Sequence, residues 1–201
     1  MFKDDPLVFS PGTKAEYSTY GFNLLGSVVE GAAGMKYLDY LRENVFQPAG
    51  MTDTRADDVF EIIPNRAHGY MRIGAGTLAN SKLADTSNKI PGGGLCATAA
   101  DVARFAAAIQ AGTLLRRETM QPMFVVQKTK DGRRTGYGLG WLVGAWKGRR
   151  EVWHHGGQPR VSTLLYMQPD RRLAIVFLAN LEGVAPSLTS LARELSLRIS
   201  P

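Results

Sequence analysis

Three short stretches of the sequence place ionisable or hydroxyl side chains next to turn-forming residues. They are Tyr17-Ser18-Thr19, Gly92-Gly93-Gly94 and His154-His155-Gly156-Gly157. A tyrosine or a histidine can transfer protons to and from a reacting group, and glycines let a substrate approach the backbone closely. Backbone N–H groups exposed beside such glycines can bind a carbonyl oxygen. Together these residue types suggest a site that moves protons next to a polarised carbonyl.

The tyrosine and the histidines also have simpler structural interpretations. Tyr17 can be an aromatic residue that packs at the entrance of a helix, and one histidine can be packed while its neighbour is exposed. Metal binding by His154 and His155 is disfavoured, because adjacent residues on a strand point to opposite faces. The third histidine, His68, is distant in the sequence. We therefore expect no metal and no other cofactor.

Two predicted helices would position Tyr17 and Thr19. After the turn at residues 10–12, the spacing of apolar residues predicts a helix that ends near Gly31 or Gly34. We expect its core face to consist of Leu24, Leu25, Val28 and Val29. A second helix is predicted to close before Pro48. Its apolar face would consist of Tyr37, Leu38, Leu41 and Val45.

Residues 50–94 form a long, irregular segment rich in Thr, Asp, Asn, Gly and Pro. Segments of that length without secondary structure are uncommon in compact domains, and are usually functional or disordered. After the three glycines, Thr98 is predicted to cap a further helix. The buried face of that helix would consist of Val102, Phe105, Ala106 and Ile109. A short helix over residues 118–124 is expected to follow.

Beyond residue 135 the apolar pattern changes to that of strands. Four segments have this pattern: YGLGWLVGAW, EVWHH, RVSTLLYMQ and RRLAIVFLAN. Short polar turns join them, which predicts an antiparallel meander. The chain would end in a helix that covers one face of the sheet with Leu188, Leu191, Ala192, Leu195 and Ile199. We expect a single α+β domain over residues 1–201, with a mainly helical, site-lining part (1–125) and an antiparallel part with the C-terminal helix (135–201).

The charge of the chain does not predict a nucleic-acid partner. Lys and Arg outnumber Asp and Glu by 24 to 18, but the densest basic run, QKTKDGRRTG, is interrupted by a turn at Asp131-Gly132 and contains no aromatic residue for base stacking. We expect this run to be a solvated loop. No stretch approaches the roughly 18 apolar residues that cross a bilayer, so no membrane contact is evident. Cys96 is the only cysteine and cannot form an intramolecular disulfide, and we expect its side chain to be small and buried.

The order of these motifs resembles the serine β-lactamase and penicillin-binding-protein superfamily, and above all its class C-like branch of esterases, D-aminopeptidases and mitochondrial β-lactamase-like proteins. FSPGTKAEYSTYGFNLLGSVVEGAAGMKYLDYLRENVFQPAGMTDT is similar to the segment with the second motif of that family. PGGGLCATAADVARFAAAIQAG resembles its glycine-rich turn into a helix, and VWHHGGQPRVSTLLYMQPDRRLAIVFLAN its third-motif strand and the strands that follow. The resemblance runs from about Phe9 to the C-terminal helix. It implies a β-lactamase/transpeptidase-like fold and acyl transfer through a serine that a lysine activates in S-x-x-K.

This resemblance gives Tyr17 and Thr19 expected roles. Tyr17 matches the tyrosine that shares protons with the serine and lysine and protonates the leaving group. An ordinary tyrosine has a pKa near ~10, so it needs neighbouring cations to act near neutral pH. Thr19 stands where the family often has Asn, which binds substrate, and a hydroxyl cannot make the two-ended contact of an amide.

The resemblance assigns roles to the second half of the site as well. His154 would support Tyr17 electrostatically or through a hydrogen bond. His155 stands where Thr is usual, which weakens the expectation that the site recognises the carboxylate of a β-lactam, and with Gly156 it would bind substrate. Gly157 would supply one backbone N–H of the oxyanion hole.

The nucleophile is the residue that this pattern lacks. No serine is followed by a lysine three positions later, and sixteen residues before Tyr17 are too few for the helix that carries S-x-x-K. Thr86-Ser87-Asn88-Lys89 has the spacing but lies after the tyrosine motif, and Lys128-Thr129-Lys130 lacks the glycine of the third motif. We therefore expect this chain to be the C-terminal part of a longer hydrolase, inactive alone and with an open sheet edge through which it can oligomerise.

Two functional hypotheses follow. The first is a serine hydrolase for a small ester, amide or β-lactam, whose Ser and Lys lie outside this chain. The second is a non-catalytic module that binds a ligand or oligomerises with the same half of the fold. The sequence identifies neither the substrate nor the compartment, because a targeting segment would lie upstream.

Overall fold

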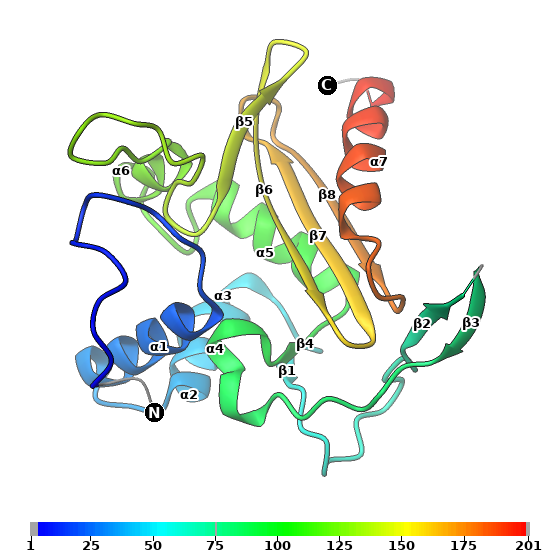
Figure 1. The fold of residues 1–201 in the computed structure, drawn as a ribbon. Helices are drawn as coiled ribbons and strands as arrows, with labels where there is room; N and C mark the ends of the chain where they lie inside the picture. The colour runs from blue at the N-terminus through cyan, green and yellow to red at the C-terminus, as the bar shows by residue number, and fades with distance from the viewer. Residues whose placement is uncertain (1–3, 75, 200–201) are drawn as a thin grey trace.

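The computed structural model describes residues 4–74 and 76–199. Its centre is a four-stranded antiparallel sheet with the order β5-β6-β7-β8. The strands are β5 (Leu142–Trp146), β6 (Arg149–Gln158), β7 (Val161–Gln168) and β8 (Leu173–Ala179). Helix α5 (Ala99–Ala111) packs on one face and α7 (Ala185–Arg198) on the other (Figure 1). The expected meander is confirmed, except that the first five residues of YGLGWLVGAW precede β5 instead of extending it.

The two faces of the sheet follow from the alternation of side chains along β7. Leu164 and Tyr166 point towards α7 and pack with its buried Ala192. Met167 points the other way and packs with Ala106 of α5. The sheet is therefore the middle layer of a three-layer arrangement, and the N-terminal helices lie beside it (Figure 1).

Helix α1 (Thr19–Ala33) ends where the sequence predicts. The Ser18 hydroxyl accepts a hydrogen bond from the Gly21 N–H at 3.2 Å, which caps the first turn. Gly34 ends the helix in the left-handed region, with φ 66°.

The predicted core face of α1 is wrong. Leu24, Leu25 and Val28 are 53%, 55% and 57% exposed. The helix packs on α4 (Ile90–Gly93) with its opposite side, where an added Cβ on Gly26 would lie 2.3 Å from the Pro91 ring. The periodicity of the sequence identified an apolar stripe but could not show whether another element covers it. Within residues 4–74 and 76–199, no element covers this stripe.

The second helix does not close before Pro48 as predicted. It consists of α2 (Tyr37–Leu41), a π-helical turn η1 (Arg42–Phe46) and α3 (Gln47–Ala49), and it ends at Gly50 with φ 70°. Pro48 is tolerated because it lies in the first turn after the change of helical register, where its missing N–H costs little. The expected apolar face is only half-buried, and Phe46, which the prediction omitted, is buried.

Residues 50–94 contain more secondary structure than the sequence indicated. β1 (Arg55–Ala56) pairs with β4 (Leu95–Cys96), and β2 (Tyr70–Ile73) forms a hairpin with β3 (Thr77–Asn80). A 3-10 turn, η2 (Ser87–Lys89), precedes α4. These elements were missed because two to four residues are too few to establish a period. Cys96 is half-buried instead of fully buried, and its burial raises the pKa of the thiol.

A buried carboxylate attaches this segment to α5. Asp101 is fully buried and accepts hydrogen bonds from the Asp53 N–H and the Thr54 hydroxyl, both at 2.8 Å. Arg104 forms an ion pair with it at 2.7 Å. Burial alone would raise the pKa of Asp101, but these hydrogen bonds and Arg104 lower it overall. The predicted cap is confirmed, because the Thr98 hydroxyl accepts from the Asp101 N–H.

The remaining helices agree with the predictions in outline. In α5, Ala106 and Ile109 are buried, whereas Val102 and Phe105 are only half-buried. α6 (Arg117–Met120) and a 3-10 turn, η3 (Gln121–Phe124), form the predicted short helix, and another 3-10 turn, η4 (Pro169–Arg171), joins β7 to β8.

The predicted stripe of α7 is only partly correct. Ala192 is buried, but Leu191 is 44% exposed, and Ile199 is 42% exposed and lies beyond the helix. The stripe is wider than the surface of the sheet beneath it, so its edges remain in solvent.

An ion pair is buried beneath α7. Glu151 of β6 is fully buried, and the Arg193 Nε lies 3.2 Å from each of its carboxylate oxygens. The Arg193 guanidinium also lies 5.1 Å from the ring centroid of Trp146 and 5.3 Å from that of Trp153. This arrangement fixes α7 to β5 and β6 by charge as well as by apolar contact.

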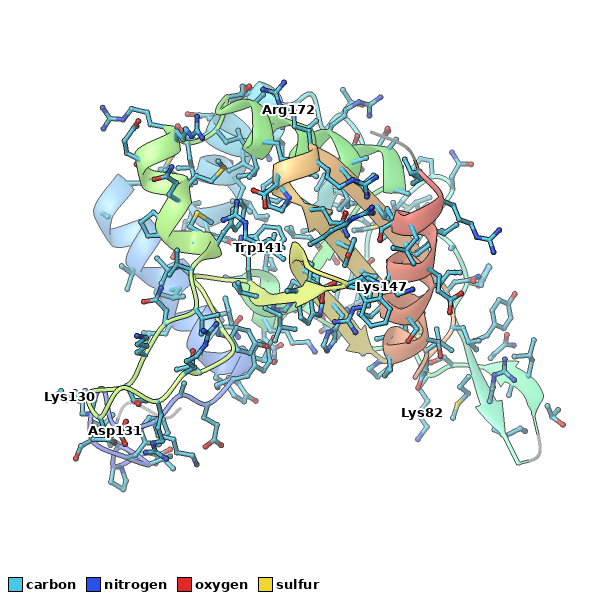
Figure 2. All side chains as sticks on the ribbon, turned by 90° about the horizontal axis from the view of Figure 1, so that it is seen from above. Lys82, Lys130, Asp131, Trp141, Lys147 and Arg172 are labelled. Carbon is cyan, nitrogen blue, oxygen red and sulfur yellow. The ribbon has the colours of Figure 1, made fainter. Side chains whose placement is uncertain are left out.

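The basic run is a solvated loop, as predicted. Lys128, Lys130 and Arg133 are exposed, and Figure 2 shows Lys130 and Asp131 at the edge of the molecule, far from the core residue Trp141. Within the described residues, no helix has the length and apolar character that crossing a membrane requires.

Candidate active site

Tyr17 and His154 come together in the tertiary structure. Tyr17 lies immediately before the cap of α1, and His154 lies in the middle of β6. Their ring centroids are 6.0 Å apart, with the ring planes tilted by 44°. Tyr17 is 51% exposed and His154 is half-buried, so the pair lies at the surface and can be reached by a substrate.

Two further aromatic residues, which the sequence did not identify, complete this cluster. The Tyr137 ring lies 6.4 Å from the rings of both Tyr17 and His154. The Phe22 ring lies 5.6 Å from Tyr17 and 6.5 Å from His154. Tyr137 belongs to the segment that we had assigned to a strand, and no sequence pattern indicated that its loop folds back over Tyr17.

The cluster changes the acidity of two of its members. Burial, and then the charge of neighbouring His155, lower the pKa of His154, against a smaller opposing effect of a backbone hydrogen bond with His155. Burial, with a contribution from Tyr17, raises the pKa of Tyr137. A histidine with a lowered pKa is neutral near pH 7, so His154 can support Tyr17 as a hydrogen-bonding group and not as a cation.

The glycine-rich turn lies between α1 and β6. Asn23 of α1 accepts a hydrogen bond from the Gly92 N–H at 2.9 Å, and the Gln158 amide at the end of β6 donates to the Gly93 carbonyl at 3.1 Å. An added Cβ at Gly92 would come within 2.7 Å of Thr19 atoms, so only glycine allows this approach. Asn23 and Gln158 therefore hold the three motifs together, and sequence analysis had assigned neither of them a role.

The backbone of β6 beyond His154 forms a free edge. β5 pairs with β6 only up to Trp153, opposite Leu142. Gln158 and Val161 close a two-residue hairpin, which requires them to be a hydrogen-bonded pair. By the alternation of an antiparallel ladder, the N–H and C=O of Gly157 then point away from β7, towards the side that β5 leaves open.

Thr19, His155 and Gly156 occupy different positions around this edge. Thr19 is the first residue of α1 and touches the glycine-rich turn. His155 is exposed, and its ring centroid lies 6.2 Å from that of His154. Gly156 pairs with Thr163, whose hydroxyl would lie 2.5 Å from an added Cβ, so a side chain here would disturb the hairpin.

Within residues 4–74 and 76–199, no three His, Cys, Asp or Glu side chains are grouped as a metal site would require.

Comparison with known proteins identifies the family. The Beta-lactamase family model matches residues 1–197. The human mitochondrial serine beta-lactamase-like protein LACTB is 30% identical over 95% of this chain, which spans 42% of that protein. This chain therefore covers less than half of the length of that relative.

Solved structures support the same assignment. The penicillin-binding protein from Bacillus halodurans superimposes with a TM-score of 0.78 and 26% identity, covering 96% of this chain and 59% of that one. An octameric penicillin-binding protein homologue from Pyrococcus abyssi shares the fold, with a TM-score of 0.77, 22% identity and coverage of 94% and 44%. With its mixed helices and antiparallel sheet, the chain belongs to the β-lactamase family of serine hydrolases, which includes the penicillin-binding proteins.

Proposed function

We propose that this chain forms the proton-transferring and oxyanion-binding half of a serine-hydrolase site for small esters, amides or β-lactams. The nucleophilic Ser and its Lys would come from a part of the protein outside residues 1–201. The observation that carries the proposal is the free edge of β6, where the Gly157 N–H points outwards, three residues from His154 and its partner Tyr17.

The proposed reaction uses each group at a defined step. The serine oxygen attacks the substrate carbonyl and its proton passes to the lysine and Tyr17 pair, while the Gly157 N–H binds the oxygen that becomes negative. Tyr17 then donates a proton to the leaving group, and water later releases the acyl group from the serine. Loss of one such oxyanion donor typically costs about 2.7–4 kcal/mol.

Two observations favour a nucleophile from outside the chain. None of its serines has the S-x-x-K spacing. In addition, the exposed apolar face of α1 starts beside Tyr17 and continues along the helix through Tyr20, Leu24 and Val28. An apolar stripe of that kind usually packs against another element, and we infer that the segment with the Ser and Lys covers it.

A fluorophosphonate probe, which labels activated serines, tests the proposal. Residues 1–201 alone should not be labelled. The longer polypeptide encoded by the same reading frame should be labelled at a serine outside this range. Stoichiometric labelling of the 201-residue chain would refute the claim that it lacks a nucleophile. Failure of the longer protein to be labelled would refute the proposed hydrolase activity.

The proposed contact between α1 and the segment with the Ser and Lys can be tested separately. Leu24→Glu should leave the isolated chain folded, because the side chain is exposed there, but should abolish labelling of the longer protein. Lys82→Glu, which introduces a carboxylate outside the cluster, is the matched control and should preserve labelling. Equal labelling of the two variants would show that nothing packs on this face.

A non-catalytic assembly module is the second candidate, because β8 is an edge strand of the four-stranded sheet. Its seven residues, LAIVFLA, contain no charge that would discourage pairing with another strand. The octameric assembly described for the Pyrococcus abyssi homologue makes self-association worth testing. Analytical ultracentrifugation of the wild type and of Leu178→Lys, at an exposed position of β8, tests this candidate. Oligomers in the wild type that are lost in the variant, without any probe labelling in the longer protein, would favour it.

A further inference from the structure

Gln158 makes the hydrogen bond that joins the end of β6 to the helical part of the chain. Its side-chain amide donates to the Gly93 carbonyl at 3.1 Å. Gly93 is the last residue of α4, and the carbonyls in the last turn of a helix have no partner within that helix. Gln158 therefore gives α4 a hydrogen bond that the helix cannot make for itself.

The α4 end of this hydrogen bond is fixed, because α4 packs closely on α1. The Gly92 N–H donates to the Asn23 side chain at 2.9 Å, and a Cβ added to Gly26 would lie 2.3 Å from the Pro91 ring. A side chain bound to α4 is thus held at a defined position relative to α1, and relative to Tyr17, which lies just before that helix.

The backbone that carries the Gly157 N–H has few other contacts to hold it. β5 does not pair with β6 beyond Trp153, and a Cβ added to Gly157 would meet no atom within 4 Å. Gly156 precedes it, and glycines leave the backbone more conformational freedom than any other residue. Pairing with β7 therefore holds this stretch on one side only.

Two side chains on one face of β6 tie this stretch to the helices. His154 and Gln158 are four residues apart on a strand, so they point to the same face and lie roughly 13 Å from each other along it. The His154 ring contacts Tyr17, and Gln158 contacts α4. Gly157 lies between these two anchors, next to Gln158, so its N–H depends on Gln158 for its position.

We propose that Gln158 is a positioning residue, which fixes the Gly157 N–H relative to Tyr17 through the hydrogen bond to Gly93. This inference rests on the proposed function, where Gly157 is the oxyanion donor. Such a donor must lie about 2.7–3.1 Å from the oxyanion, and a misplacement of about 1 Å can cost 10²-fold in rate. Because the oxyanion forms only in the transition state, loss of Gln158 should slow the reaction without weakening substrate binding.

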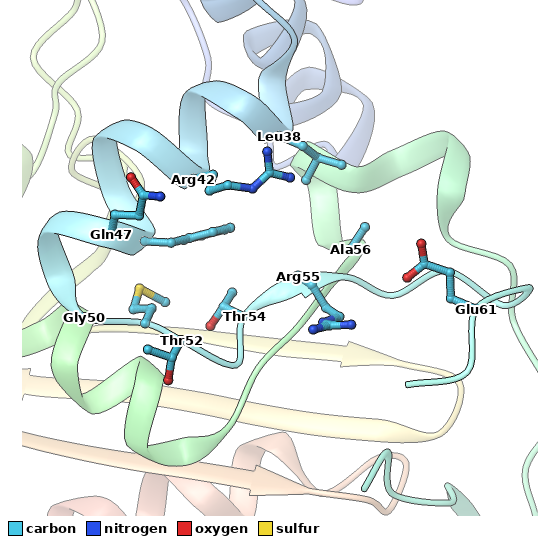
Figure 3. A pocket seen from close by; sticks show the side chains of 11 residues that line it. Leu38, Arg42, Gln47, Gly50, Thr52, Thr54, Arg55, Ala56 and Glu61 are labelled. Atoms are coloured by element: carbon cyan, nitrogen blue, oxygen red, sulfur yellow. The ribbon is translucent and has the colours of Figure 1, made fainter. Parts of the chain in front are cut away.

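The kinetics of fluorophosphonate labelling in the longer protein test this effect. Gln158→Ala should lower the maximal rate of labelling by about tenfold or more and leave the probe concentration for half-maximal rate unchanged. Gln47→Ala is the matched control and should label like the wild type. Gln47 lies in α3 beside a pocket to which the Tyr17 cluster contributes no residue (Figure 3). An unchanged maximal rate for Gln158→Ala, or a change only in the half-maximal concentration, would overturn the proposal.

Gln158→Glu asks whether the donated hydrogen bond is what matters. A carboxylate cannot donate to the Gly93 carbonyl, whereas a protonated carboxyl group can. The facing carbonyl oxygen should raise the pKa of the new carboxyl group above its ordinary value of about 4.3. The maximal labelling rate of this variant, divided by that of the wild type at the same pH, should therefore rise as the pH falls from about 8 to about 5. A ratio that does not change with pH would contradict the proposed role.

NMR of the 201-residue chain separates this inference from the proposed function. Gln158→Ala should shift the Gly94 amide resonance, because that amide shares a peptide group with the Gly93 carbonyl. It should also lower the order parameter of the Gly157 N–H from about 0.85 towards about 0.6. Gly112, which ends α5, should change in neither respect.

The two measurements fail independently. If the wild-type longer protein is not labelled, the proposed hydrolase is wrong, and the NMR data still decide whether Gln158 holds the edge of β6. If the Gly157 order parameter is the same in the wild type and in Gln158→Ala, Gln158 is not a positioning residue, even in a protein that is labelled.

Discussion

The Tyr17 phenol packs against the His154 imidazole with ring centroids 6.0 Å apart, although the two residues lie far apart in the sequence. One precedes α1 and the other lies in β6. Four predictions follow from this contact and from the elements around it.

Replacement of Tyr17 by Phe should slow acylation in the longer protein. The ring contacts with Phe22 and His154 remain in the variant, whereas the phenolic proton is lost. Loss of general acid–base help typically costs 10²–10⁴-fold, so we expect the rate of fluorophosphonate labelling to fall by about 10²-fold or more. Tyr70→Phe, on the β2–β3 hairpin and outside the Tyr17 cluster and the exposed face of α1, is the control and should label normally. An unchanged rate for Tyr17→Phe would leave this tyrosine with a packing role only.

His154 should make the folded state less stable in acid. Because burial lowers its pKa in the folded chain, the unfolded chain binds a proton more readily once the pH falls below the ordinary value of about 6.5. This contribution to stability is complete above that pH and is lost as the pH falls through the lowered pKa. Urea unfolding of the wild type and of His154→Gln, between about pH 7.5 and 5, should show a steeper loss for the wild type, by up to about 1.4 kcal/mol per pH unit.

The charge of His155 provides an independent check of this explanation. It is the second cause of the lowered pKa of His154, so His155→Gln should raise that pKa and reduce the acid sensitivity. Parallel pH dependences in the wild type and His154→Gln would show that other groups control stability in this range.

Arg160→Gly should stabilise the hairpin between β6 and β7. Arg160 follows Pro159 in the two-residue turn and has φ 81°, a conformation that glycine adopts without steric cost. An L-residue there costs roughly 1–2 kcal/mol, and the extra freedom of glycine in the unfolded chain offsets about half of this. We expect a gain of about 0.5–1 kcal/mol in the free energy of unfolding. Arg160→Ala keeps the strain and should give no gain.

Removal of Arg193 should be far more damaging than removal of an exposed arginine. Arg193→Met leaves the fully buried Glu151 carboxylate without its partner, and breaking a buried ion pair costs about 3–5 kcal/mol. Arg150→Met breaks the pair with Asp170, whose side chains are 45% and 62% exposed, and should cost less than about 1 kcal/mol. Chemical denaturation of the two variants gives the comparison, and similar losses would contradict the assigned importance of burial.

The sequence alone determined the order of the elements and the local signals that begin and end them. The strand period predicted the meander, and the residue types at Gly34 and Thr98 marked helix ends that the structure confirms. These features depend on backbone conformation and on residues a few positions apart, so a linear pattern contains them. The order of the motifs also led to the family, and the family to expected roles for Tyr17, His154 and Gly157.

Only the tertiary structure decided which surfaces meet. It showed that the apolar face of α1 is open, that Tyr137 joins the Tyr17 cluster, and that Asn23 and Gln158 hold the glycine-rich turn between α1 and β6. It also showed that β5 begins only at Leu142, opposite Trp153, which leaves the backbone of β6 around Gly157 unpaired on that side. Each of these facts is a contact, or the lack of one, between residues far apart in the chain. Periodicity encodes which face of an element is apolar, but not which partner covers that face.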